Sequence, residues 1–134
     1  MLKHIYEYKY RYDVAVLYKR GEGDCQKTQD YVLLHYMLYD PEKTKPPNYW
    51  PDLGTIEMNK IGENKYRCYL PKVFIQTPLL SFNKHKVIIV DFIKNGGMKG
   101  ESIDIEGAYE QEIVSRDVLN GSIKIFIVFK IANE

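Results

Sequence analysis

The chain has 134 residues, with 19 lysines and arginines against 18 aspartates and glutamates, and a formal net charge of +1. This length suits a single domain over residues 1–134, which can bury a core without help from disulfides or metals. The near-neutral charge excludes the strongly basic surface that nucleic acids and anionic membranes attract, and no apolar run approaches the roughly 20 residues of a membrane-spanning helix. We therefore expect neither a nucleic-acid partner nor a membrane partner.

The N-terminal stretch from His4 to Tyr12 alternates tyrosines with charged residues, which is the two-residue period of a β-strand. The alternation continues with Val14, Val16 and Tyr18 on the same face, in one long strand or in two strands joined near Asp13. We expect this face to lie in the core or at its rim. Residues 20–30 are polar and include two glycines, which predicts a loop. Tyr31–Tyr39 is apolar or aromatic almost throughout, which predicts a strand buried on both faces, with a buried helical turn as the alternative.

A proline-rich stretch follows between Asp40 and Pro51, and its four prolines exclude both a helix and a central strand. This stretch holds the only tryptophan, Trp50, beside Tyr49. A loop stiffened by proline is hard to bury and loses little conformational entropy on binding. We therefore expect Tyr49 and Trp50 to be exposed and available to a ligand.

The second half of the chain continues with short alternating segments. Strands are predicted at Thr55–Met58, Lys65–Leu70, Val87–Lys94, Glu101–Val114 and Ser122–Ile131. No segment keeps a helical period over three turns. Strand after strand with turn signals between them predicts an all-β fold, an antiparallel two-layer sandwich of the Ig-like or jelly-roll-like kind with about seven or eight strands.

The connections between these strands are predicted from their turn residues. Ile61–Asn64 is expected to be a turn, and His85 is expected in another. Gly107 is expected to mark a bulge or a bend within its strand. Arg116–Asn120 is expected to be a short connection before the hairpin signal Asn120-Gly121.

No catalytic or metal-binding motif is visible. The three histidines, His4, His35 and His85, share no spacing typical of metal ligands. Cys25 and Cys68 form no CxxC pair, which favours two free thiols over a disulfide between a loop and a strand. We predict no catalytic residue, no metal and no cofactor.

Carboxylates alternate along one stretch of the chain: Asp104, Glu106, Glu110 and Glu112. Calcium binding or acid–base catalysis would require such groups to converge. Alternating carboxylates are more typical of the solvated face of a half-buried strand, and no calcium-loop motif accompanies them. We therefore interpret the row as a solvated face.

Over residues 14–109 the order of aromatic and polar landmarks resembles the Ig-like starch-binding carbohydrate-binding modules. The residues that carry the resemblance are Leu17-Tyr18-Lys19, His35-Tyr36, Trp50-Pro51, Met58, Tyr66, Asp91-Phe92 before Asn95-Gly96-Gly97, and Tyr109. The resemblance implies a small β-sandwich in which His35 and Trp50 contact the ligand.

We expect a non-catalytic binding module whose favoured ligand is a carbohydrate, held by Trp50, Tyr49, His35 and Tyr36. One alternative is a structural or assembly protein that pairs with a protein partner or with itself, as a homo-oligomer, through its tyrosine-rich strand. A further alternative is a small enzyme on a β-scaffold with scattered catalytic residues. The N-terminus shows no signal-peptide pattern, which favours a cytoplasmic location.

Overall fold

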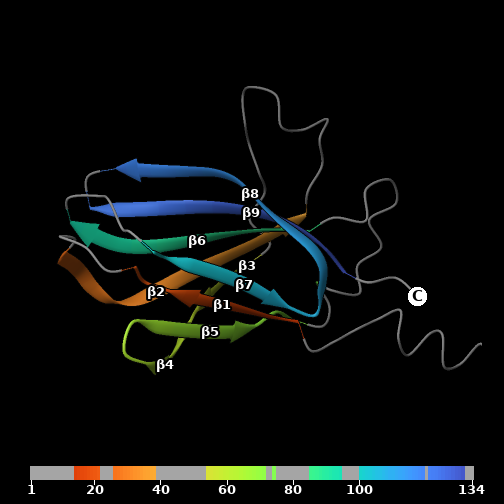
Figure 1. Ribbon diagram of the computed structural model, residues 1–134, viewed down its shortest axis with the longest axis horizontal. Coiled ribbons are helices and arrows are strands. Elements are labelled where there is room, and N and C mark those ends of the chain that lie inside the picture. Colours follow the sequence, from red (N-terminus) through yellow and green to blue (C-terminus); the bar gives the residue numbers. More distant parts are fainter. Residues whose placement is uncertain are drawn as a thin grey trace, which may run out of the picture.

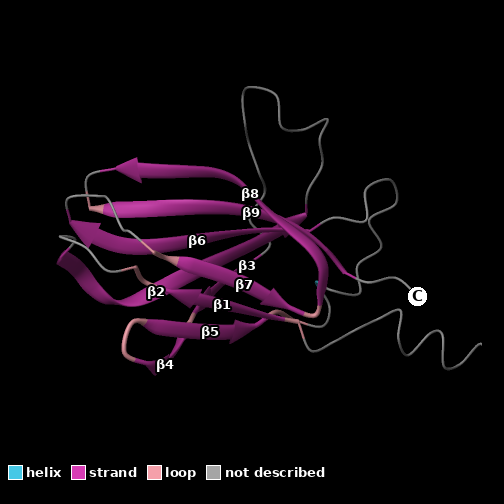
Figure 2. Ribbon diagram, in the orientation of Figure 1, coloured by secondary structure: helices cyan, strands magenta, loops and turns pink. Residues whose placement is uncertain are grey.

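The computed structural model describes residues 14–21, 26–38, 54–71, 74, 85–94, 100–119 and 121–131. These ranges are almost entirely β-structure (Figure 1; Figure 2). The strands are β1 (Ala15–Lys19), β2 (Gln26–Leu38), β3 (Gly54–Glu57), β4 (Asn59–Gly62), β5 (Lys65–Tyr69), β6 (His85–Lys94), β7 (Ser102–Glu106), β8 (Ala108–Leu119) and β9 (Ser122–Ile131). No helix in this described part is long and apolar enough to cross a membrane.

The strands form two antiparallel sheets, which confirms the predicted all-β, two-layer class. One sheet has the strand order β4-β5-β1-β7 and the other has the order β3-β2-β6-β9-β8. The chain passes from the first sheet to the second through a single residue, Gly107, between β7 and β8 (Figure 1). Its φ of 90° lies in the left-handed region that favours glycine. The expected bend is therefore present, and Glu101–Val114 contributes to two strands in different sheets rather than to one.

The core lies between the sheets and is built from alternate residues of the facing strands. The inward residues of β9 are Ile123, Ile125, Ile127, Phe129 and Ile131, and all are buried. The first sheet supplies its own buried row: Val14, Val16, Tyr18, Tyr66, Cys68, Leu70 and Ile105. These are the faces that the two-residue alternation predicts. Cys68, in the first of these sheets, has a free thiol, and burial raises the pKa of that thiol to about 12.

Four expected turns or loops were wrong, and one of them is His85, which begins β6. Gln26–Asp30, expected in a loop, is the start of β2; it is polar because Lys27–Asp30 is exposed beyond the core. Arg116–Leu119 extends β8 and is polar because β8 lies at the edge of its sheet. Ile61 and Gly62 belong to β4, so the β4–β5 turn is only Glu63-Asn64, with Asn64 at a φ of 59°.

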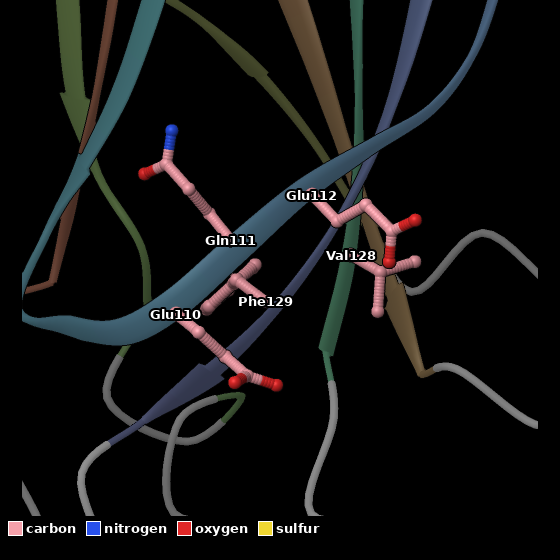
Figure 3. Close-up of a pocket in the computed structure, with 5 residues that line it drawn as sticks. All are labelled: Glu110, Gln111, Glu112, Val128 and Phe129. Carbon is pink, nitrogen blue, oxygen red and sulfur yellow. The ribbon is translucent and has the colours of Figure 1, made fainter.

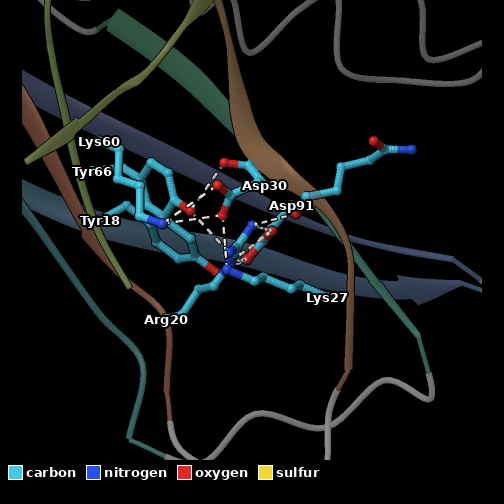
Figure 4. Close-up of polar contacts among 8 residues, drawn as sticks. Tyr18, Arg20, Lys27, Asp30, Lys60, Tyr66 and Asp91 are labelled. Carbon is cyan, nitrogen blue, oxygen red and sulfur yellow. Dashed lines mark hydrogen bonds and ion pairs between the residues drawn. The ribbon is translucent and has the colours of Figure 1, made fainter. Parts of the chain in front are cut away.

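A buried polar network connects the two sheets at one end of the sandwich (Figure 4). Asp91 of β6 is fully buried and accepts hydrogen bonds from two side chains of the opposite sheet. The Tyr18 hydroxyl donates to its Oδ2 at 2.8 Å, and the Arg20 Nη2 donates to its Oδ1 at 2.7 Å. The Arg20 Nε lies 2.9 Å from Oδ2, so guanidinium and carboxylate form a bidentate ion pair.

The rest of the network supplies further hydrogen-bond acceptors for Arg20. Its Nη1 donates to the Tyr66 hydroxyl at 2.9 Å, and its Nη2 also donates to the Gln29 carbonyl at 3.1 Å. The guanidinium carbon lies 4.9 Å from the centre of the Tyr66 ring. Burial, reinforced by the nearby Asp91 carboxylate, raises the pKa of Tyr18, so the hydroxyl stays protonated and donates.

Replacing Asp91 by asparagine tests this network. Asp91→Asn leaves the Arg20 guanidinium buried without its counter-charge, and we expect the free energy of unfolding to fall by about 3–5 kcal/mol. Urea denaturation followed by far-UV circular dichroism measures the loss. The matched control is Asp104→Asn, the same change at an exposed position, where we expect a change within about 0.5 kcal/mol. Equal effects of both substitutions would contradict a stabilising role for the Arg20–Asp91 pair.

Candidate functional site

The structure places His35 and Tyr36, two of the predicted ligand contacts, on opposite faces of β2. His35 is half-buried on the outer face, where its Nδ1 lies 2.8 Å from the Thr55 hydroxyl of β3. Tyr36 points inward, and the centre of its ring lies 5.0 Å from that of Phe74. Its hydroxyl lies over Gly54, where a Cβ would collide with the Tyr36 side chain. One ligand surface cannot use both side chains.

The other predicted contacts lie outside the described residues. Tyr49 and Trp50 are in that part of the chain, as are Cys25 and the tyrosine-rich stretch His4–Tyr12. A carbohydrate site formed by Tyr49, Trp50 and His35 therefore stays a prediction, with Tyr36 on the opposite face of β2.

The predicted acidic row is divided between the two sheets. Asp104 and Glu106 lie on β7, whereas Glu110 and Glu112 lie beyond Gly107 on β8. Glu110 and Glu112 point to one side of β8 and border a hollow of about 320 Å³ with Val128 and Phe129 of β9 (Figure 3). Within the described ranges, no group of three or more His, Cys, Asp or Glu side chains could hold a metal ion.

Gln111 points to the opposite side of β8 and contacts the other sheet (Figure 3). Its Oε1 accepts a hydrogen bond from the Ile105 backbone N–H at 2.7 Å, and its Nε2 donates to the Ile103 carbonyl at 3.0 Å. The side-chain amide therefore satisfies the edge of β7 as a neighbouring strand would. An Arg116–Glu101 ion pair holds the same side of the sandwich.

The outer face of the four-stranded sheet gathers aromatic and charged side chains in three rows that run across β5, β1 and β7. These rows are Tyr69–Ala15–Glu106, Arg67–Leu17–Asp104 and Lys65–Lys19–Ser102. Directly opposite residues of an antiparallel pair lie on the same face and interact. The face therefore places one aromatic side chain, three cations and two carboxylates close together.

Tyr69 is the aromatic side chain of this face and is 57% exposed. The Arg67 guanidinium carbon lies 5.4 Å from the centre of its ring. An exposed ring on a rigid sheet can stack on a flat apolar surface, while a guanidinium beside it can donate hydrogen bonds to the same ligand. This arrangement is suited to binding rather than to covalent catalysis.

A hollow of about 320 Å³ lies at the other end of the same face. It is lined by Leu17, Tyr18, Lys19, Ile61, Lys65, Tyr66, Ser102 and Asp104. Ile61 is exposed and apolar, whereas the lysines, the serine and the aspartate supply hydrogen-bonding groups. A ligand there would meet a mixed surface open to solvent.

The alternation of β5 contains a signal for this face, although none of its residues is among the predicted site residues. Assigning Tyr66, Cys68 and Leu70 to the core leaves Lys65, Arg67 and Tyr69 facing outward by alternation. The alternation does not reveal which strands lie beside β5. The contribution of β1 and β7 to the face comes from long-range pairing that local alternation does not encode.

The chain matches no protein-family model, and neither a curated protein nor a solved structure is significantly similar to it.

His85, expected in a turn, begins β6 and is buried in the core. Its ring stacks on Phe129 at a centroid distance of 5.4 Å and meets the edge of Phe74 at 4.8 Å. Burial lowers the pKa of His85 to about 4, although the Phe74 backbone partly offsets the effect. A neutral imidazole sealed between two aromatic rings cannot exchange protons with a bound substrate, so His85 is a core residue.

The lowered pKa of His85 predicts that the fold loses stability in acid. The pKa of about 4 in the folded state lies below the usual 6.5, so the unfolded state binds a proton first as the pH falls. The contribution of His85 to the free energy of unfolding is therefore fully present above pH 6.5. It decreases between pH 6.5 and 4, by up to about 3 kcal/mol. Urea denaturation at several pH values measures this slope. We expect His85→Phe to flatten it, and an unchanged slope in that variant would contradict the assignment.

Proposed function

We propose that the protein is a non-catalytic carbohydrate-binding module whose ligand lies on the outer face of the four-stranded sheet. The observation that carries the proposal is the exposed Tyr69 ring beside Arg67, on the same face as the hollow around Lys19 and Ser102. Sugar rings have apolar C–H faces that stack on aromatic rings, and their hydroxyls need hydrogen-bonding partners nearby. Both requirements are met on this face.

The mechanism needs little rearrangement of the protein. Tyr69 and Lys65 are four residues apart on β5, which separates them by about 13 Å along the strand. An extended oligosaccharide could therefore stack on Tyr69 and continue past Arg67 and Asp104 towards the hollow. Since these groups stand on strands rather than loops, little conformational entropy is lost on binding.

The predicted contacts Trp50, Tyr49 and His35 remain a separate prediction for the same function. His35 lies on the other sheet, so a ligand on the Tyr69 face does not reach it. The two candidate surfaces are therefore distinguished by separate substitutions.

Tyr69→Ala tests the proposal. Removing the stacking ring should weaken binding to the polysaccharide that the wild type prefers by about tenfold or more, as expected for an aromatic anchor. Affinity electrophoresis in gels that contain soluble polysaccharides measures the effect. Tyr31→Ala is the matched control, because Tyr31 is an exposed tyrosine on the other sheet, packed beside Phe92, and should leave binding unchanged. Failure of every polysaccharide to retard the wild type would overturn the proposal.

The edge strand β8 favours a second candidate function, the binding of an extended polypeptide. Every residue from Glu110 to Val118 is exposed, and no described strand pairs with the far side of β8. Three apolar side chains are among them: Ile113, Val114 and Val118. An exposed edge with apolar side chains is suited to accept a further strand, although the bulge between Ile113 and Ser115 interrupts regular pairing.

The charges of β8 disfavour a second copy of the chain as that partner. With Val114 looped out in the bulge, antiparallel self-pairing centred on Ser115 places Glu112 opposite Asp117. Self-pairing centred on Ile113 places Glu110 opposite Asp117 instead. Like charges directly opposite one another are destabilising. The edge is better suited to a strand that alternates apolar and basic residues, even though β9 already supplies Lys130 and Lys124 opposite Glu110 and Asp117.

Two synthetic probes test this second candidate. A labelled peptide of alternating valine and lysine should bind more tightly than its valine–glutamate counterpart, by about fivefold or more in fluorescence anisotropy at low salt. The charge-reversed variant Glu112→Lys/Asp117→Lys should invert the preference. Equal affinity of the wild type for both peptides would remove the candidate.

A further inference from the structure

Two lysines stand directly opposite each other on the outer face of the four-stranded sheet. Lys19 of β1 pairs with Lys65 of β5, and both side chains are exposed. Like charges at directly opposite positions destabilise a sheet. No acidic side chain lies directly opposite either lysine. The other neighbour of Lys65 is Gly62 of β4, and the other neighbour of Lys19 is Ser102 of β7. The pairing therefore carries a cost that no group in the row offsets.

Arg67 adds a third cation to the same face, two residues from Lys65 along β5. Among the described residues, none of these three cations forms an ion pair. The ion pairs found there belong to other groups: Arg20–Asp91, Lys27–Asp30, Lys60–Asp30 and Arg116–Glu101. The carboxylates of the face, Asp104 and Glu106, lie across β1 on β7. The β5 side of the face is therefore uniformly positive.

The lysine pair lines the hollow of about 320 Å³ described above, together with the hydroxyl-bearing Ser102. Ammonium groups from two strands and a serine hydroxyl are donors that suit the oxygens of an anion. An anion placed between Lys19 and Lys65 would convert their mutual repulsion into two attractions. The open hollow admits a charged substituent that remains attached to a larger molecule.

We propose that this hollow binds the anionic substituent, a sulfate ester or a carboxylate, of an acidic polysaccharide. This inference rests on the proposed function and names its ligand class: one sugar ring stacks on Tyr69 while the anionic group of a neighbouring sugar lies between Lys19 and Lys65. Arg67 lies between the two positions and contacts either the linkage or a second anionic group. Asp104, at the border of the hollow, limits the number of anionic groups that the site accepts.

Binding to three polymers tests the inference: neutral dextran, dextran sulfate and polygalacturonate. We expect at least one acidic polymer to bind about tenfold more tightly than dextran, with an affinity that falls as salt is added. The two acidic polymers distinguish a sulfate ester from a carboxylate. Lys19→Gln/Lys65→Gln should lose this preference, while its melting temperature stays the same or rises because a repulsion is removed. The matched control, Lys94→Gln/Lys124→Gln, removes two exposed lysines of the other sheet and should retain it.

The outcomes separate this inference from the proposed function. Binding that needs Tyr69 but is equal for neutral and acidic polymers, or unaffected by Lys19→Gln/Lys65→Gln, would overturn the inference and leave the carbohydrate function standing. Binding to none of the polymers would overturn the inference. Inorganic sulfate then gives a separate readout of the anion site, because it should raise the melting temperature of the wild type more than that of Lys19→Gln/Lys65→Gln. A sulfate effect without binding to any polysaccharide would show a site for small anions, and it would overturn both the acidic-polysaccharide inference and the carbohydrate function.

Discussion

The ion pair between Arg20 and Asp91 is the constraint on which the rest of the structure depends. Among the described residues, this buried ion pair ties the end of β1 in one sheet to β6 in the other by charge, in a core that is largely apolar. Removing two charges from water is expensive, and the network recovers that cost only because Tyr18, Tyr66 and the Gln29 carbonyl complete the hydrogen bonding. The pair therefore contributes to specificity by fixing how the two sheets face each other.

That alignment also fixes the outer face. Tyr18 and Tyr66 point inward to the network, so their neighbours Lys19 and Lys65 point outward and face each other. The like-charge pair is thus a consequence of burying the two tyrosines. A core interaction and a candidate ligand contact share the same two strands, and each restricts the residues that the other can use.

The amino-acid sequence predicts the strands better than it predicts their neighbours. In β9 the buried face follows from alternation alone, because each inward residue is large and apolar. The network was not predictable in this way. Arg20 adjoins a polar glycine-containing stretch, and Asp91 lies in an apolar strand more than seventy residues away. Similarly, the sequence around Tyr69 predicts only an outward-facing strand residue, because it does not show that β1 and β7 lie beside β5. Local periodicity determines which way a side chain points, whereas the site depends on pairing between distant segments.

The order of strands in the larger sheet has a consequence for how the protein is made. β6 lies between β2 and β9, and β9 is the last of the described strands in chain order. While the chain is synthesised, β6 therefore exposes one unpaired edge and an apolar, β-branched sequence until β9 is complete. Such a segment is prone to pair with other chains. Chains that lack β9 therefore carry an aggregation risk at β6 that pairing with β9 removes.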